Sequence, residues 1–152
     1  MSTLTHEPRT SSSELHDPPL PVKAKLAAAW SSLMFLYIYV DHLNLYKPGV
    51  VADLLAGRVF EFEASQTFVI VALTLVGIPA VMVVLSAALP ARVNRPLNLV
   101  LGALYVPVSL FNLSGGEWLG FYGLGVGLEV LVLAFVLRSA WTWPRTGASS
   151  LG

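Results

Sequence analysis

The sequence predicts an all-α membrane protein in which four transmembrane helices form an antiparallel bundle with both termini in the cytoplasm. Of the 152 residues, 55% are hydrophobic and 12% are charged, whereas soluble proteins carry about 25% charged residues. A small water-facing globule cannot bury that surplus of apolar side chains, but a bilayer can accommodate it. Most of the chain consists of four apolar runs, each close to the roughly 17–25 residues that cross a bilayer.

Polar segments flank these runs. Residues 1–22 contain four prolines and a run of three serines without apolar periodicity, which predicts a disordered cytoplasmic tail. No basic start leads directly into a short apolar core, so we expect the first run to be retained rather than cleaved as a signal peptide. Residues 144–152 are expected to form a second cytoplasmic tail, which leaves residues 23–143 for the bundle.

The four runs predict helices at about residues 26–46, 67–89, 97–113 and 119–143. Backbone groups in hydrocarbon must be hydrogen-bonded within their own segment, and the runs lack the alternation of barrel strands. The last two connections are short, which predicts antiparallel neighbours. The first connection is longer, and its residues 50–55 are expected to form one or two turns at the membrane surface.

Basic residues near the helix ends predict the orientation. One side of the membrane would carry six of them and the other only Lys47 and Arg58. The positive-inside rule then places the side with more basic residues, and both termini, in the cytoplasm. The expected location is the inner membrane of the cell. The six are Lys23, Lys25, Arg92, Arg95, Arg138 and Arg145.

Polar residues of the third predicted helix share one face. Their spacing of 4, 3, 4 and 3 residues places them on one stripe at 3.6 residues per turn. Such a stripe is expected to face the bundle, because lipid cannot pair polar groups, and helix–helix contact is favoured over a ligand path. The stripe consists of Asn98, Gly102, Tyr105, Ser109 and Asn112.

Glu129 lies midway along the last predicted helix. An ionisable group at that depth costs about 2.5–3.5 kcal/mol on insertion scales, so it is expected to face protein or water. Matching its depth to that of Tyr105 predicts a hydrogen bond between them. A structural carboxyl is favoured over proton transfer, because no second acid, histidine or arginine lies at this depth. The candidate buried polar cluster is Glu129, Tyr105, Tyr122, Asn98 and Ser109.

The opposite face of the last helix carries small residues at the spacing that lets two helices approach closely. Packing within the chain and packing against a second copy are equally open, so a homodimer through this helix is one expectation. The candidate helix-packing face consists of Gly116, Gly120, Gly123 and Gly127.

The first predicted helix carries Trp30, Met34, Tyr37, Asp41 and Asn44 on one face. A candidate outer polar site consists of Asp41, Asn44 and Asn112, although a helix end anchored among the headgroups is favoured. The adjacent pair Asp41 and His42 lacks the i+3 or i+4 spacing of helical metal ligands. In the second helix, Gly77 and Pro79 predict a bend.

Several function classes are excluded or disfavoured. The chain has no cysteine, which excludes disulfides, thiolate metal sites and cysteine nucleophiles. No HExxH, GxSxG or phosphate-loop motif occurs, and the net charge of zero suggests no nucleic-acid partner. We therefore expect that the protein is not an enzyme and that it has no catalytic residue, no metal-binding residue and no cofactor. The leading hypothesis is a homo-oligomer or an accessory subunit of a membrane complex; the alternative is a small transporter or channel subunit that uses Glu129. No substrate is indicated.

Several segments resemble a family of small bacterial membrane proteins catalogued only as a domain of unknown function. The resemblance covers roughly residues 24–145. It implies the same four-helix architecture and supplies no catalytic or binding residues. The segments that carry it are residues 34–41 (MFLYIYVD), 45–49 (LYKPG), 55–58 (LAGR), 89–95 (LPARVNR) and 140–144 (AWTWP).

Overall fold

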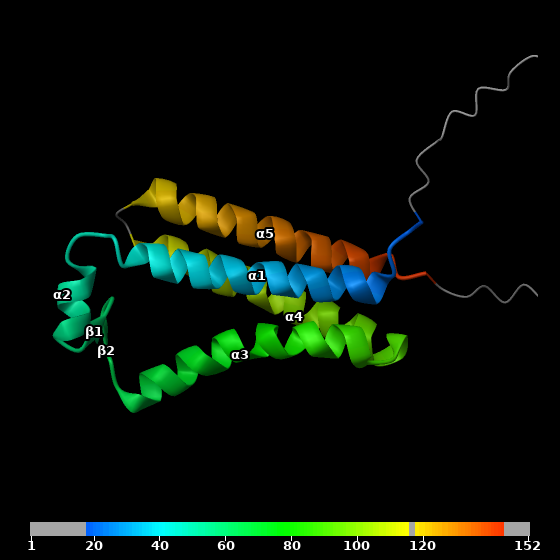
Figure 1. Ribbon diagram of the computed structural model, residues 1–152, viewed down its shortest axis with the longest axis horizontal. Coiled ribbons are helices and arrows are strands. Elements are labelled where there is room, and N and C mark those ends of the chain that lie inside the picture. Colours follow the sequence, from blue (N-terminus) through cyan, green and yellow to red (C-terminus); the bar gives the residue numbers. More distant parts are fainter. Residues whose placement is uncertain (1–17, 116–117, 145–152) are drawn as a thin grey trace, which may run out of the picture.

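The computed structural model describes residues 18–115 and 118–144. Four long helices lie side by side (Figure 1). A short helix, a two-stranded antiparallel hairpin and one 3-10 turn complete the described fold. In chain order the elements are α1 (Val22–Asn44), α2 (Val50–Leu55), β1 (Arg58–Val59), β2 (Phe62–Glu63), α3 (Gln66–Ala88), α4 (Ala91–Phe111), η1 (Asn112–Gly115) and α5 (Leu119–Trp141). The predicted N-terminal tail lies mostly outside the described residues, and so does the C-terminal one.

The long helices alternate in direction. Helix α1 packs against both α3 and α5, while α4 packs mainly against α5. The start of α1 and the end of α5 lie at the same end of the molecule (Figure 1). The core between the helices consists mostly of apolar side chains that are fully buried, namely Leu26, Trp30, Leu33, Met82, Tyr105, Leu133 and Val136.

Three helices, α1, α3 and α5, are long and apolar enough to cross a membrane. Their bounds agree with the predicted ones to within a few residues. Helix α4 begins at Ala91, whereas we predicted a start at residue 97, because we took Pro96 as a boundary. Inside the helix, Pro96 removes the hydrogen-bond donor for the carbonyl of Arg92. Arg92 is exposed, so water can satisfy that carbonyl and the helix tolerates the proline.

Helix α3 bends midway along its length, as predicted (Figure 1). Pro79 has no N–H, so the carbonyl of Leu75, four residues earlier, has no donor within the helix. The hydroxyl of Tyr105 on α4 donates to that carbonyl at 2.7 Å. The buried residues of α3, which are Pro79, Met82 and Ser86, all follow the bend, whereas most side chains of residues 66–75 are exposed.

The segment between α1 and α3 forms a small cap at one end of the bundle (Figure 1). Helix α2 forms where we expected one or two turns. The hairpin was not predicted, because each of its strands has only two residues. Gly49 and Gly57 have φ values of 91° and 76°, a backbone region that strongly favours glycine. An exposed ion pair of 2.7 Å between Arg58 and Asp53 ties the hairpin to α2.

Candidate functional site

A buried polar node joins α1, α3 and α4. The indole N–H of Trp30 and the hydroxyl of Ser86 both donate to Asn98 Oδ1, at 2.6 and 3.3 Å. The Asn98 amide donates to Asn94 Oδ1 at 2.6 Å, and the Asn94 amide donates to the Ser86 carbonyl, also at 2.6 Å. All four residues are fully buried. Because each polar side chain has a partner, this node holds helices together and offers no free group for chemistry.

Asn94 is part of this node and was missed. It lies four residues before Asn98, so it continues the polar stripe of α4 by one turn. The stripe was started at Asn98 because the helix was expected to begin at residue 97. The spacing itself was a sufficient signal.

The predicted hydrogen bond between Tyr105 and Glu129 is wrong. Tyr105 donates instead to the Leu75 carbonyl. The depth matching failed because α4 begins earlier than predicted, so Tyr105 is not at its middle. A Cβ on Gly102 would lie 3.1 Å from a side-chain carbon of Leu137. Counting along antiparallel helices from that contact places Ser109 level with Glu129.

Glu129 lies in a buried layer between α1, α4 and α5. Its side chain is fully buried, and neither carboxyl oxygen has a hydrogen-bond partner. Ser109 on α4 is within interaction range of the carboxyl, and its hydroxyl lies 3.4 Å from that of Tyr37 on α1. Tyr37 was not in the predicted cluster, although the polar face of the first helix pointed to it. This layer contains the one buried carboxyl of the described residues.

Tyr122, near the start of α5, makes a contact that is separate from the layer around Glu129. Its hydroxyl donates to Asn44 Oδ1 at 2.7 Å. The five residues of the predicted cluster are thus all buried, but they lie in four separate groups. In the predicted outer site, Asp41 and Asn112 are exposed and Asn44 is half-buried. No hydrogen bond among the described residues links Asp41 to either asparagine.

The glycine face of α5 points away from the other described helices. Gly120, Gly123 and Gly127 are exposed, and a Cβ added to any of them would meet nothing within 4 Å. On the opposite face, a Cβ on Gly125 would lie 2.9 Å from Val40 Cγ2. The alternative that the glycine face packs within the chain is therefore wrong for these three residues. Gly116 lies outside the described residues.

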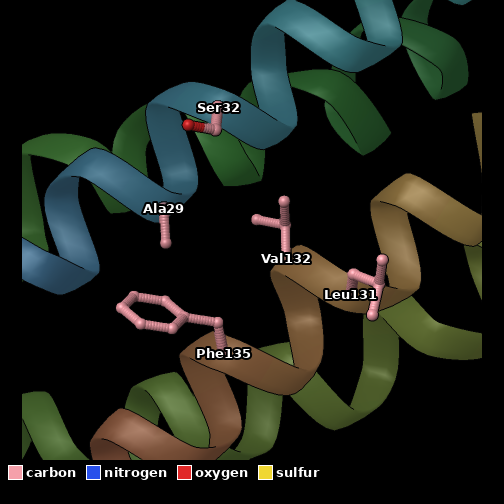
Figure 2. Close-up of a pocket in the computed structure, with 5 residues that line it drawn as sticks. All are labelled: Ala29, Ser32, Leu131, Val132 and Phe135. Atoms are coloured by element: carbon pink, nitrogen blue, oxygen red, sulfur yellow. The ribbon is translucent and has the colours of Figure 1, made fainter.

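Two shallow apolar grooves mark the surface of the helices. The first, of about 270 Å³, lies between α1 and α5 (Figure 2) and is lined by Ala29, Ser32, Leu131, Val132 and Phe135. The second, of about 400 Å³, separates α3 from α4 and is lined mainly by aliphatic side chains around Gly77 and Met82. Neither groove contains a titratable group. In the described part of the chain, no three His, Asp or Glu side chains are placed to hold a metal ion.

Comparison with known proteins places the chain among relatives without an assigned activity. The profile of one family, described as a family of unknown function, matches residues 21–150. No curated protein and no solved structure matches the chain. The comparisons therefore add no functional residues to the geometry described above.

Proposed function

The chain belongs to this family of unknown function (DUF6326), and we propose that it is a non-enzymatic, multi-pass protein of the bacterial inner membrane that self-associates through α5. The three apolar helices support a membrane location. Helix α4 would provide a fourth crossing, because its 21 residues span about 31 Å at 1.5 Å per residue. Its buried asparagines face the protein, while Val100, Leu104 and Leu110 are exposed.

The distribution of charge supports an orientation with both termini in the cytoplasm. Lys23 and Lys25 lie at the start of α1, Arg92 and Arg95 at the start of α4, and Arg138 near the end of α5. The antiparallel arrangement brings these three helix ends to one end of the bundle. A concentration of lysine and arginine there is the pattern of a cytoplasmic side.

The observation that carries the proposal of self-association is the outward glycine face of α5. Helix association in lipid depends on close packing, which small residues allow. The open space beside Gly120 and Gly127 is available to a helix of a second copy. Leu131, one turn beyond Gly127, also lines the groove between α1 and α5, so a partner helix on the glycine face could place a side chain there.

Disulfide crosslinking tests this proposal, since the natural chain has no cysteine. A single cysteine is introduced by Leu124→Cys, at a position that is 67% exposed and close to the glycine face. We expect a crosslinked dimer in membranes, and its loss when Gly120→Leu and Gly127→Leu are added. Gly77→Leu is the matched control, because its Cβ also meets open space but lies on α3. An unchanged dimer yield in the double variant would refute the glycine contact.

A transporter or channel subunit is the second candidate function. The unpaired carboxyl of Glu129 is the observation that favours it. A single set of four mostly apolar helices has too few polar positions to line a pore, so this function would also require an oligomer. Proton flux into vesicles that contain the protein or its Glu129→Gln variant tests this candidate. Equal proton flux in both samples would refute transport through Glu129 and leave self-association as the proposed function.

A further inference from the structure

The layer around Glu129 continues as a line of polar side chains toward one end of the bundle. We propose that Glu129 is a reversible proton-binding site that exchanges protons with the end of the bundle carrying Asn44 and Tyr122, through Ser109, Tyr37 and Asp41. The inference rests on the membrane placement proposed above, but it does not depend on self-association.

The surroundings of Glu129 identify a proton as the ligand. The carboxyl is fully buried with both oxygens unpartnered, and an isolated carboxylate in such a site carries a large desolvation cost. From α1, Tyr37 and Asp41 are in electrostatic range of it; from α4, Ser109 lies beside it and Tyr105 is one turn away. None of these groups is a cation. A bound proton removes the charge that the site cannot compensate.

The register of α1 against α5 determines where the polar side chains of α1 lie relative to Glu129. Val40 lies beside Gly125, and Asn44 bonds to Tyr122, so the antiparallel count brings Tyr37 level with Glu129. Asp41 follows one turn nearer the end of α1 and is exposed. Tyr37 is in electrostatic range of both Glu129 and Asp41, so it is a neighbour of the buried carboxyl and of the exposed one.

Hydroxyl groups can donate and accept hydrogen bonds at once, so they can pass protons along such a line. On release, the Glu129 carboxyl gives its proton to a hydroxyl oxygen of Ser109 or Tyr37. That hydroxyl gives up its own proton in turn, and the Asp41 carboxylate or water takes it. On uptake, the same transfers run in reverse, so no other reactant is consumed.

Toward the opposite end, the interior holds packed apolar side chains and polar side chains that already have hydrogen-bond partners. Leu33 and Leu133 are fully buried, and the rings of Trp30 and Tyr105 meet edge to face with centroids 6.1 Å apart. The hydroxyl of Tyr105 is already bonded to the Leu75 carbonyl. Beyond Tyr105, the polar side chains of the node around Asn98 also have partners, so we infer that exchange runs to the end with Asn44 and Tyr122.

Reaction with dicyclohexylcarbodiimide tests the bound proton. This apolar reagent adds to protonated carboxyls and rearranges to an N-acylurea without a leaving group, and peptide mass spectrometry locates the adduct. In phosphatidylethanolamine and phosphatidylglycerol vesicles, we expect labelling of Glu129 that declines as the pH rises and is lost in Glu129→Gln. Absence of labelling at every pH would overturn the proposal. Protection by sodium chloride at constant pH would also overturn it, in favour of a cation site.

The exchange route is tested separately by infrared spectroscopy. The carbonyl band of the protonated carboxyl, identified by its loss in Glu129→Gln, shifts on transfer to D₂O, and the rate of that shift measures exchange. We expect Tyr37→Phe and Asp41→Asn to slow it several-fold, whereas Tyr39→Phe, which changes an exposed tyrosine of the same helix, leaves it unchanged. Wild-type rates in both Tyr37→Phe and Asp41→Asn would refute the route.

The carboxyl labelling is repeated in the variant carrying Gly120→Leu and Gly127→Leu. Retained labelling in a monomer would show that proton binding is independent of self-association. Loss of labelling there, with the helix content unchanged, would refute that independence. The experiment therefore distinguishes a loss of the dimer from a loss of proton binding at Glu129.

Discussion

The bond between Tyr105 and the Leu75 carbonyl gives the sharpest prediction for stability. Substitution Tyr105→Phe removes the hydroxyl but keeps the ring that packs on Trp30. The Leu75 carbonyl then has no donor, since Pro79 cannot supply one. A buried polar group without a partner costs about 1–3 kcal/mol, while side-chain hydrogen bonds measured in a membrane protein average about 0.6 and reach about 1.7 kcal/mol. We therefore expect the free energy of unfolding to fall by about 1 kcal/mol.

A double-mutant cycle isolates this effect. Pro79→Ala restores a backbone N–H that can bond to the Leu75 carbonyl within the helix. In that background Tyr105→Phe should cost little, so the coupling between the two positions should be about 1 kcal/mol, in the range seen for residues that share a partner. Straightening of α3 by Pro79→Ala affects both arms of the cycle and does not enter the coupling.

Reversible unfolding in mixed micelles, with increasing denaturing detergent and far-ultraviolet circular dichroism, measures the four free energies. Tyr39→Phe is the control, because Tyr39 is 60% exposed and should change stability little. Equal costs of Tyr105→Phe with and without Pro79→Ala would refute the reasoning, since the hydroxyl would then stabilise something other than the carbonyl that the proline leaves free.

Three further predictions concern other contacts. Asn98→Leu should lower the free energy of unfolding by about 1–3 kcal/mol in the same assay, because the buried partners of Asn98 lose their bonds; an unchanged stability would contradict the node. Gly125→Ala should destabilise by about 1–3 kcal/mol through overpacking, whereas Gly123→Ala, on the open face, should be neutral or stabilising; equal effects would contradict the assigned faces. Arg58→Ala should cost under about 1 kcal/mol and less still in high salt, and a larger cost would show that the exposed ion pair with Asp53 orders the hairpin.

Much of the fold could be predicted from the sequence, because the bilayer imposes simple constraints on length and hydrogen bonding. Unbroken apolar runs located α1, α3 and α5 closely. Pro79 predicted the bend in α3. The long first connection, with its turn residues around Gly49, predicted one or two turns where α2 forms. The start of α4 could not be read reliably, because a proline near a helix start can either begin the helix or lie inside it. Here the carbonyl that Pro96 leaves without a donor belongs to Arg92, which is an exposed residue.

The contacts of the candidate site were less predictable. Sequence spacing showed which face of each helix is polar, and the residues of the α4 stripe from Asn98 to Ser109 are indeed buried. It did not show how far one helix is shifted along its neighbour, and that shift decides whether Tyr105 or Ser109 meets Glu129. The bond from Tyr105 to Leu75 required a further inference, namely that a proline in one helix creates an acceptor for another.

The two halves of α3 are held very differently, and this has a consequence for how the protein responds to its membrane. After Pro79 the helix is anchored by Met82 and Ser86, whereas before it most side chains are exposed. With α3 crossing a membrane as proposed above, we expect the tilt of the part before Pro79 to vary more with hydrocarbon thickness than the tilt of the part after it. We expect a thicker membrane to bring this part of α3 closer to the membrane normal, and the cap of α2 and the hairpin to move with it.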